Sequence, residues 1–457
     1  MRNHRGSRRG SVKVLAVVGV SVVALAGCSS SSGTSSSSPP SGSGSASSVA
    51  GAIKVGVLTT CGGPFAAFEA ESFSGAKYAL VKYAGAHLTG KKPQDPVTGA
   101  TVAGKPIEID YGCSDASPDK AVAEARRLVE SVGVKVLLGP LSGDEGVAVA
   151  SYAKSVPGVT FVNGTSGAQA TTLTGSAPNF FRLGGDGAQW MAGVGTYAFK
   201  TLGWKNVAIL GEDYSYPYTQ AAGFISEFCS LGGNVSTRSW VPLTTADWSS
   251  AVAKLPRNVD GILLLTGGTN TVSAEKAYIQ IGGNPGKTML GGSSVMDPTS
   301  FTVGDPLVGL VGGSPVPLGG TSSDWTGYVA GFKTAFPDVP ADSLFTVLYY
   351  DGMQSIVQAL TQTKGDLSNN ESAFKAALTA LNPTFPNGSV TLDSNRNSIQ
   401  PAFVTQISKN GGELGFKVLQ TVPKVDQTFG GLFSPNSPAP SRTSPACTKG
   451  NPPPWVK

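Results

Sequence analysis

The chain has 457 residues, 40% of them hydrophobic and 14% charged, so it is long enough to bury more than one core. It carries 34 basic and 29 acidic residues, which gives a formal net charge of +5. The basic excess lies before residue 14, at Arg2, Arg5, Arg8, Arg9 and Lys13, and the remainder holds 29 residues of each sign. A neutral body has no broad electrostatic attraction for nucleic acid, so we exclude nucleic-acid binding.

The first 27 residues have the pattern of an export signal. The basic head is followed by an apolar run over residues 14–26, which is too short to span a bilayer comfortably. The run ends in Leu25-Ala26-Gly27-Cys28, which resembles the bacterial lipobox and implies that Cys28 is lipidated. An ordinary signal peptide with an incidental cysteine is the alternative. Residues 7–13 also resemble a twin-arginine motif, but Ser11 replaces its usual bulky residue, so the export route stays open.

Residues 28–51 are almost entirely Ser, Gly, Pro and Ala and predict a flexible tether. Its root-mean-square reach is about 25–30 Å. No later segment is comparably apolar, so we expect membrane attachment through lipid alone. Residues 432–457 form a Pro- and Ser-rich tail.

Between the tether and the tail, short apolar strands alternate with amphipathic helices, which favours doubly wound parallel α/β sheets. About 380 residues exceed one comfortable core, so two lobes are expected. Helix starts are marked by Ser117-Pro118-Asp119 before residues 121–131, and by Thr244 and Asp247 before residues 249–255. The predicted strands are Ile53–Leu58, Ile107–Tyr111, Val134–Leu138, Val159–Val162, Val207–Leu210, Gly261–Leu265 and Thr288–Leu290.

Motifs of catalysis are missing from the sequence. Residues 282–288 resemble a phosphate-binding loop, but a helix precedes them where a strand is needed, so we interpret them as a helix-to-strand turn. Outside the tether there is no Gly-x-Ser-x-Gly, and the chain has no Cys-x-x-Cys. His87 is the sole imidazole after the signal. We therefore expect no catalytic residue, no metal site, no cofactor and no enzyme.

Four cysteines remain after Cys28, and in an exported chain they suggest two disulfides. We favour Cys61 with Cys113, because both follow strands that would be neighbours in the sheet. We favour Cys229 with Cys447, which would attach the tail to a helix. Four free buried thiols are the alternative.

Polar, glycine-rich turns follow two of the strands, at the sheet edge where open α/β folds bind ligands. Residues 139–145, Gly-Pro-Leu-Ser-Gly-Asp-Glu, open a helix whose first amides suit a carboxylate. A capping box formed by Ser142 and Glu145 is an equally good account of that turn. Residues 161–167, Phe-Val-Asn-Gly-Thr-Ser-Gly, offer hydroxyls beside amides or form a plain turn.

In the order of these parts, residues from Ile53 to about Lys424 resemble the type I periplasmic binding proteins for leucine, isoleucine and valine. The resemblance rests on the opening strand with Gly63-Pro64, on Tyr111-Gly112-Cys113, on the two turns above, and on residues 213–216, Asp-Tyr-Ser-Tyr. It implies two Rossmann-like lobes joined by three crossing segments. It also implies a ligand site formed by Phe68, Ser142, Gly143, Thr165, Ser166, Tyr216, Thr269, Asn270 and Ser293.

We expect the first lobe to hold residues 52–183 and 315–399, and the second to hold 184–314 and 400–431. The crossings are expected near Arg182–Gly185, Gly312–Val316 and Ser398–Phe403. By the resemblance, the ligand carboxylate meets Ser142 or the Gly143 amide, with Thr165 and Ser166 on the next turn. Phe68 and Tyr216 supply aromatic walls; core packing is the alternative for Phe68, and the Tyr216 register is uncertain by two residues.

One position departs from the family. Its amino-acid binders place a glutamate where this chain has Ser293, and that glutamate holds the ligand ammonium. Either another acid takes its place, at Glu69, Asp144, Glu145 or Asp213, or the ligand has no primary amine. An aromatic or aliphatic acid, an amide or a urea-like compound is then the alternative ligand. The resemblance implies a monomeric, lipid-anchored binding protein that delivers a small carboxylate to an ABC permease and its ATPase. A sensing lipoprotein and an exported amidase or esterase are the alternatives.

Overall fold

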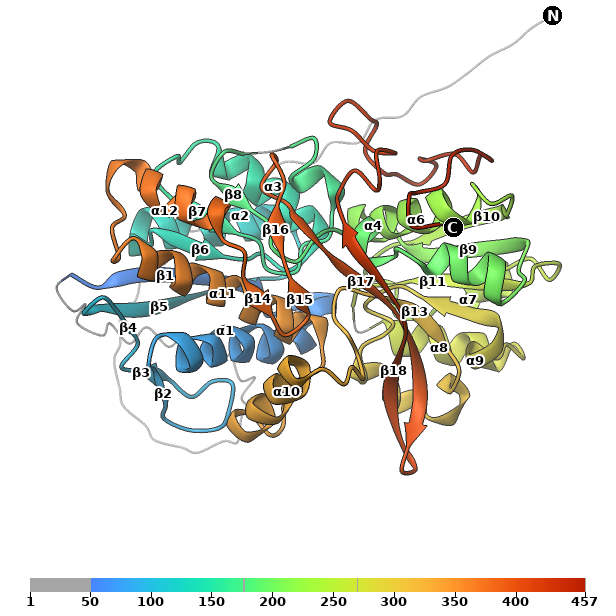
Figure 1. The fold of residues 1–457 in the computed structure, drawn as a ribbon. Helices are drawn as coiled ribbons and strands as arrows, with labels where there is room; N and C mark the ends of the chain where they lie inside the picture. The colour runs from blue at the N-terminus through green and yellow to red at the C-terminus, as the bar shows by residue number, and fades with distance from the viewer. Residues whose placement is uncertain (1–50, 176, 269, 457) are drawn as a thin grey trace, which may run out of the picture. The chain divides into compact units, whose positions relative to one another are not determined.

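The computed structural model describes residues 51–175, 177–268 and 270–456, and residues 49–457 form one compact unit. Two large sheets organise this unit (Figure 1). Early (blue) and late (orange) segments of the chain surround the first sheet, and the middle segment (green to yellow) surrounds the second. The predicted signal, the tether and Cys28 lie outside the described residues.

The first sheet is parallel except for its short edge strand β4. Its strand order is β4 (Thr101–Val102), β5 (Lys105–Ser114), β1 (Ile53–Thr60), β6 (Val136–Leu138), β7 (Thr160–Val162), β8 (Phe180–Phe181). Val55 and Val57 of β1 face one core with helices α1 (Glu69–Tyr83) and α11 (Leu344–Gln362). Leu58 faces another with α2 (Pro118–Arg126) and α3 (Gly143–Ala153). Helices on both faces explain why these strands are apolar runs.

The second sheet is mixed. Its order is β10 (Asn234–Val241), β9 (Asn206–Glu212), β11 (Gly261–Leu265), β12 (Met289–Gly291), β13 (Val311–Ser314), β17 (Ser398–Asn410), β16 (Thr391–Leu392), with β18 (Glu413–Val425) also paired to β17. Ile209 and Leu263 pack with α6 (Ser215–Phe228) on one face. The other face packs with α7 (Ser249–Ala253) and α8 (Thr271–Gln280). We call each sheet with these helices a lobe.

The remaining elements are short or peripheral. They are η1 (Gly63–Phe68), η2 (Arg127–Val132), η3 (Gln169–Thr171), η4 (Tyr197–Thr201), η5 (Pro298–Val303), η6 (Asp305–Leu307), α4 (Gly187–Trp190), α5 (Val194–Thr196), α9 (Pro285–Thr288), α10 (Ser323–Ala335), α12 (Ser368–Ala380), and the small ribbons β2 (His87–Leu88) with β3 (Val97–Thr98) and β14 (Thr384–Phe385) with β15 (Gly388–Ser389). In the described part of the chain, no helix has the length and apolar character needed to cross a bilayer.

The chain passes between the sheets after β8, after β13 and before β16, so the predicted fold class of two lobes joined by three segments is confirmed. Arg182 and Asn397 link the first and third of these segments. They form a parallel bridge, and Arg182 Nε donates to Asn397 Oδ1 at 2.5 Å. Arg182 also faces the Asp186 carboxylate at 3.5 Å, with both side chains fully buried. The residue boundaries proposed for the lobes stay a prediction.

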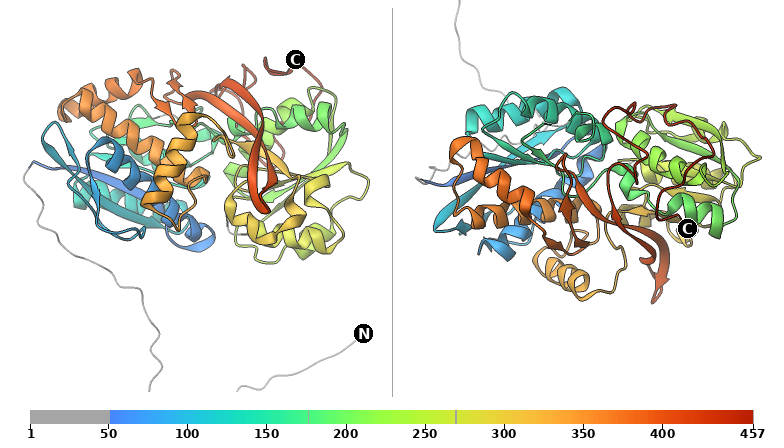
Figure 2. Two further views of the ribbon diagram at one scale, coloured as in Figure 1. Left: turned by 60° about the horizontal axis from the view of Figure 1, so that its bottom comes forward. Right: turned by 45° about the horizontal axis from the view of Figure 1, so that its top comes forward.

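Both predicted disulfides are present. Cys61–Cys113 joins the ends of the neighbouring strands β1 and β5. Cys229–Cys447 attaches the tail to the end of α6. The tail (dark red) runs over the helices of the second lobe, as Figure 2 shows, and Trp455 Nε1 donates to the buried Glu227 carboxylate at 2.6 Å.

The predicted helix-to-strand turn at residues 282–288 is also confirmed. Asn284 precedes the short helix α9, and strand β12 follows that helix.

Candidate functional site

Helix α3 begins at the predicted turn after β6. Ser142 has an extended backbone and Gly143 is the first helical residue. The Glu145 carboxylate accepts the Ser142 N–H at 3.0 Å and the Thr60 hydroxyl at 3.1 Å. The Ser142 hydroxyl is 4% exposed and has no hydrogen-bond partner. Ser142 and Glu145 form the capping box that was the alternative account of this turn, with the Glu145 half as its close hydrogen bond. Glu145 Oε2 accepts both of these bonds, whereas the buried Glu145 Oε1 and the Ser142 hydroxyl have no close hydrogen-bond partner.

The next turn, after β7, is tied to the first. The Thr165 hydroxyl donates to the Leu141 carbonyl at 3.0 Å, and the Ser166 hydroxyl donates to the Gly143 carbonyl at 3.4 Å. Parallel neighbouring strands end at the same edge of a sheet, which explains why these turns meet. Both hydroxyls are buried.

The second lobe contributes aromatic side chains. Tyr216 lies in the first turn of α6, where its hydroxyl is 3.0 Å from the Ser294 hydroxyl. The Trp190 ring meets the Tyr216 ring edge-on, with centroids 5.7 Å apart. The Ser293 hydroxyl accepts from Gln220 Nε2 at 3.0 Å. Because burial dominates, the pKa of Tyr216 is raised above its ordinary value, so its hydroxyl is neutral and can donate.

These groups surround one small cavity between the two sheets. Its volume is about 10 Å³, roughly the space of one water molecule. Four of the predicted ligand residues line it, namely Ser142, Gly143, Thr165 and Tyr216. Residues that the sequence did not predict line it too: Leu141, Gly167, Trp190, Tyr214 and Leu344.

The crevice is closed in this structure. The Ser215 N–H of the second lobe donates to the Asp144 carboxylate of the first at 3.1 Å. The Gln169 N–H donates to the Thr219 hydroxyl at 3.2 Å. An organic solute needs more room than this cavity gives, so its entry requires the lobes to separate.

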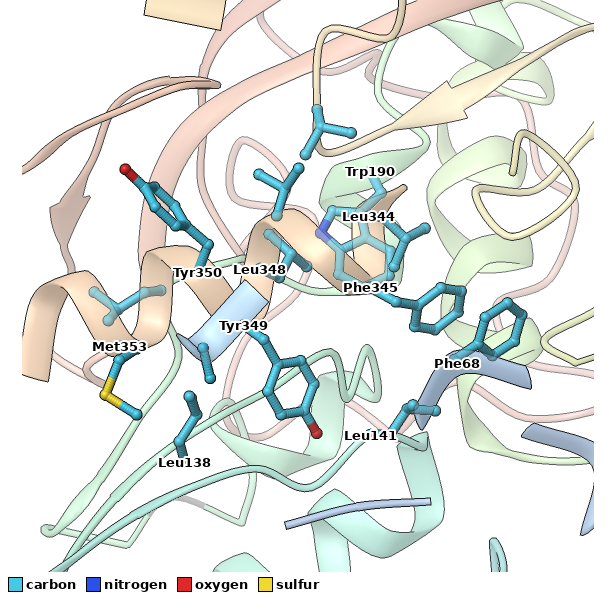
Figure 3. Close-up of a cluster of buried hydrophobic side chains, with 14 of the residues drawn as sticks. Phe68, Leu138, Leu141, Trp190, Leu344, Phe345, Leu348, Tyr349, Tyr350 and Met353 are labelled. Carbon is cyan, nitrogen blue, oxygen red and sulfur yellow. The ribbon is translucent and has the colours of Figure 1, made fainter. Parts of the chain in front are cut away.

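Other predicted ligand residues do not line the cavity. Phe68 stacks on Phe345 with ring centroids 3.7 Å apart, within a cluster of buried apolar side chains (Figure 3). Asn270 donates to the Glu212 carboxylate and to the Leu243 carbonyl. Ser166 and Ser293 are fully buried nearby. Thr269 lies outside the described residues. Ligand contact by these residues remains a prediction.

The unpredicted lining residues had weak or no sequence signals. Tyr214 lies two residues from Tyr216, within the stated uncertainty of register. Trp190 lies on the four-residue helix α4, just after the first crossing, and no motif marks it. Leu344 is the first residue of α11 and reaches the cavity from a distant part of the chain.

The cavity lining carries no charged side chain, either acidic or basic. Glu212, at the end of β9, is buried and accepts the Gly267 N–H at 2.7 Å, and burial raises its pKa to about 7. Of the proposed substitutes for the family glutamate, Asp144 binds the Ser215 N–H and Asp213 pairs with Arg442 of the tail. Glu69 lies beside the Cys61–Cys113 disulfide.

Known proteins share this architecture. The Periplasmic binding protein family matches residues 52–412. "Leu/Ile/Val-binding protein homolog 6" of Brucella melitensis is 24% identical over 389 residues, covering 83% of this chain and 93% of that protein.

Two solved structures of low identity support the fold. An ABC transporter solute-binding protein from Rhodopseudomonas palustris, in complex with p-hydroxybenzoic acid, has a TM-score of 0.72 at 23% identity, covering 82% of this chain and 98% of that one. The leucine-binding protein LivK of Thermotoga maritima has a TM-score of 0.67 at 18% identity, covering 81% and 99%. The prediction that the chain is not an enzyme is confirmed by its family. The chain belongs to the periplasmic binding protein family and is a solute-binding protein.

Proposed function

We propose that this protein captures a small carboxylate-bearing solute, such as a branched-chain amino acid, between its lobes and delivers it to an ABC permease. The observation that carries the proposal is the convergence of Ser142, Gly143, Thr165 and Tyr216, from both lobes, on one cavity. Closing the lobes presents a new surface to the permease, whose ATPase supplies the energy. The protein itself needs only affinity and a change of shape.

The carboxylate would be held by dipoles rather than by a cation. No basic residue lines the cavity, but α3 directs its N-terminus there and the buried Ser142 hydroxyl has no partner. A helix N-terminus and an unpaired buried hydroxyl both favour an anion. We propose that Ser142, the Gly143 amide and Thr165 bind one carboxylate.

The ammonium of an amino acid would need an acid. Glu212 is the buried carboxylate nearest in sequence to Tyr214 and Tyr216, and two protein donors already satisfy it. An aromatic acid without an amine is therefore a second candidate. Its supporting observation is the lining by Trp190, Tyr214 and Tyr216, which suits a flat ring. The related R. palustris structure holds such an acid.

We propose that the protein works outside the cytoplasm, anchored by a lipid on Cys28 with residues 28–51 as its tether. We propose lobe boundaries near residues 183, 315 and 399; the first two follow β8 and β13, where the chain leaves a sheet, and the third lies at the start of β17. A sensing lipoprotein would use the same fold with a receptor as partner. Loss of solute uptake on gene deletion would support transport and argue against sensing.

A thermal-shift and calorimetric screen tests the binding proposal. The chain beginning at residue 29 is mixed with aliphatic amino acids, aromatic acids, amides and urea. A solute at one hundred times its Kd should stabilise the fold by about 2.7 kcal/mol. Stabilisation by amines alone would remove the aromatic-acid candidate, and stabilisation by benzoates alone would remove the amino acids. No binding by any carboxylate would contradict the proposal.

A further inference from the structure

Two buried carboxyl groups meet at one hydroxyl in the crevice. The Ser343 Oγ lies 2.5 Å from Oε2 of Glu71 and 2.7 Å from Oδ2 of Asp297. All three side chains are at most 2% exposed. The next residue after Ser343 is Leu344, which lines the cavity, so this trio is adjacent to the proposed solute site.

The trio spans both lobes. Glu71 lies in α1, and Ser343 precedes α11; both helices pack on the first sheet. Asp297 follows β12 of the second sheet and precedes η5. Phe301 of η5 packs against Phe416 of β18, with ring centroids 4.8 Å apart, which fixes η5 to the second lobe. The contact between Asp297 and Ser343 therefore joins the two lobes in this closed form.

The two short contacts require two protons. Each O···O distance of this length is a hydrogen bond, and a hydroxyl has only one proton to donate. The Ser343 hydroxyl can donate to one carboxylate. The other carboxyl must then be protonated and donate to the Ser343 oxygen, which also accepts the Phe345 N–H at 3.2 Å. The closed form therefore binds one proton that two ionised carboxylates would not carry.

Surrounding charges favour this protonated state. Burial is the main reason that the pKa of each carboxyl is raised, and the Asp297 charge raises the pKa of Glu71 further. Asp342 is the other charged group acting on both, and its negative charge raises both pKa values. The Asp297 carboxylate also accepts the Thr299 N–H at 2.9 Å, and this hydrogen bond favours the ionised form of Asp297. The two contacts at the Ser343 hydroxyl still require one of the two carboxyls to be protonated.

We propose that closure of the lobes takes up one proton, which Glu71 and Asp297 share through Ser343, so that solute capture strengthens as the external pH falls. This inference rests on the hinge closure of the proposed function. In the open form the Asp297 carboxyl leaves Ser343 and meets water, so its pKa returns toward about 4, and Glu71 loses the neighbouring Asp297 charge. Between that value and the raised closed-form pKa, each pH unit changes the closure equilibrium up to tenfold. Above the raised pKa the closed form is ionised too, so closure takes up no proton, must bury two like charges, and no longer changes with pH.

Small-angle X-ray scattering of the chain beginning at residue 29, without solute, tests the linkage directly. We expect the radius of gyration to decrease from pH 8 to pH 5, as the closed fraction rises. In Asp297→Asn the side-chain amide can donate to Ser343, so the closed fraction should no longer depend on pH. Glu71→Gln should have the same effect from the other lobe. Asp305→Asn, at a side chain 74% exposed, is the matched control and should keep the wild-type pH response.

Superimposable pH profiles for wild type, Asp297→Asn and Glu71→Gln would overturn the proposal. Circular dichroism establishes that each variant is folded. Because the two variants lie in different lobes, a folding defect in one of them leaves the other as a test. Titration with leucine and with 4-hydroxybenzoate, in buffers of different ionisation enthalpy, counts protons for whichever probe binds. Uptake that approaches one proton per bound probe at some pH between 5 and 8 supports the linkage, and zero uptake over that whole range contradicts it. The scattering measurement uses no solute, so a failed solute screen and a failed proton linkage are separate results.

Discussion

Gly143 and Tyr216 touch across the crevice, each on the first turn of a helix from a different lobe. A Cβ atom on Gly143 would lie 3.0 Å from the Tyr216 Cβ and 2.6 Å from the Ser215 hydroxyl. The closed form therefore has no room for a side chain at this position. The two helix starts that close the cavity thus meet through a glycine.

Gly143→Ala should weaken solute binding about fivefold or more without unfolding the protein. Alanine suits a helix, but its methyl group collides with α6 when the lobes close, and overpacking costs about 1–3 kcal/mol. Gly327→Ala is the matched control, since it lies in helix α10 with nothing within 4 Å of the added Cβ. Calorimetric titration of both variants with the solute found in the screen checks this. Equal affinities would show that closure does not bring these helices together.

Tyr216→Ala should weaken binding strongly, and Tyr216→Phe should weaken it by about 0.5–1.5 kcal/mol. The phenylalanine keeps the ring that meets Trp190 but loses the hydrogen bond to Ser294. Tyr218→Phe serves as the control, because Tyr218 lies on the same helix outside the cavity lining. Unchanged affinity in Tyr216→Ala would place the cleft residues in another register.

The sequence predicted β1, β5, β6, β7, β9, β11 and β12 because each is a largely apolar run. It missed β13, which is parallel to β12 and has Gly312 and Gly313 among its four residues. It missed β10, β17 and β18, whose exposed faces carry polar residues such as Ser236, Lys409 and Lys417. Strands β17 and β18 form a long antiparallel hairpin, and such a hairpin gives a weaker apolar pattern than a parallel strand buried on both faces. Strand β8 was missed because it has only two residues.

Where a turn follows a predicted strand, as at Ser142 and Thr165, the sequence indicated side chains that line the cavity. It failed where the chain returns from far away, as at Leu344, because no local pattern records a contact made by α11. It also failed at Glu71, Asp297 and Ser343. Each is an ordinary surface-type residue in the sequence, and only the closed fold brings them together in a buried place.

Loss of the tail disulfide should destabilise the protein. Cys229→Ser with Cys447→Ser removes a link between residues 218 apart, and native disulfides typically contribute about 2–4 kcal/mol. The tail should then become a protease site, although Trp455 keeps its hydrogen bond to Glu227. Urea unfolding and limited proteolysis measure both effects. A stability equal to wild type would mean that the noncovalent contacts alone hold the tail.

Glu275→Gln should stabilise the protein at neutral pH and above. Glu275 lies on α8 with its side chain buried, neither carboxylate oxygen has a hydrogen-bond partner, and burial raises its pKa well above the ordinary value. A carboxyl whose pKa is higher in the folded than in the unfolded state binds more protons when folded. It therefore makes stability fall as the pH rises from the unfolded pKa, about 4.3, toward the folded pKa.

The amide of Glu275→Gln has no charge to desolvate, so the variant should lack this part of the pH dependence. The gain over wild type should reach 1 kcal/mol or more at pH 8 and shrink toward zero near pH 4, because the wild-type carboxyl is neutral there. Denaturant unfolding of both proteins across pH 4–8 measures the difference. Glu413→Gln, on an exposed residue of β18, is the control and should follow wild type. A stability difference that does not vary with pH would show that the Glu275 carboxyl is ionised to the same extent in the folded and unfolded states.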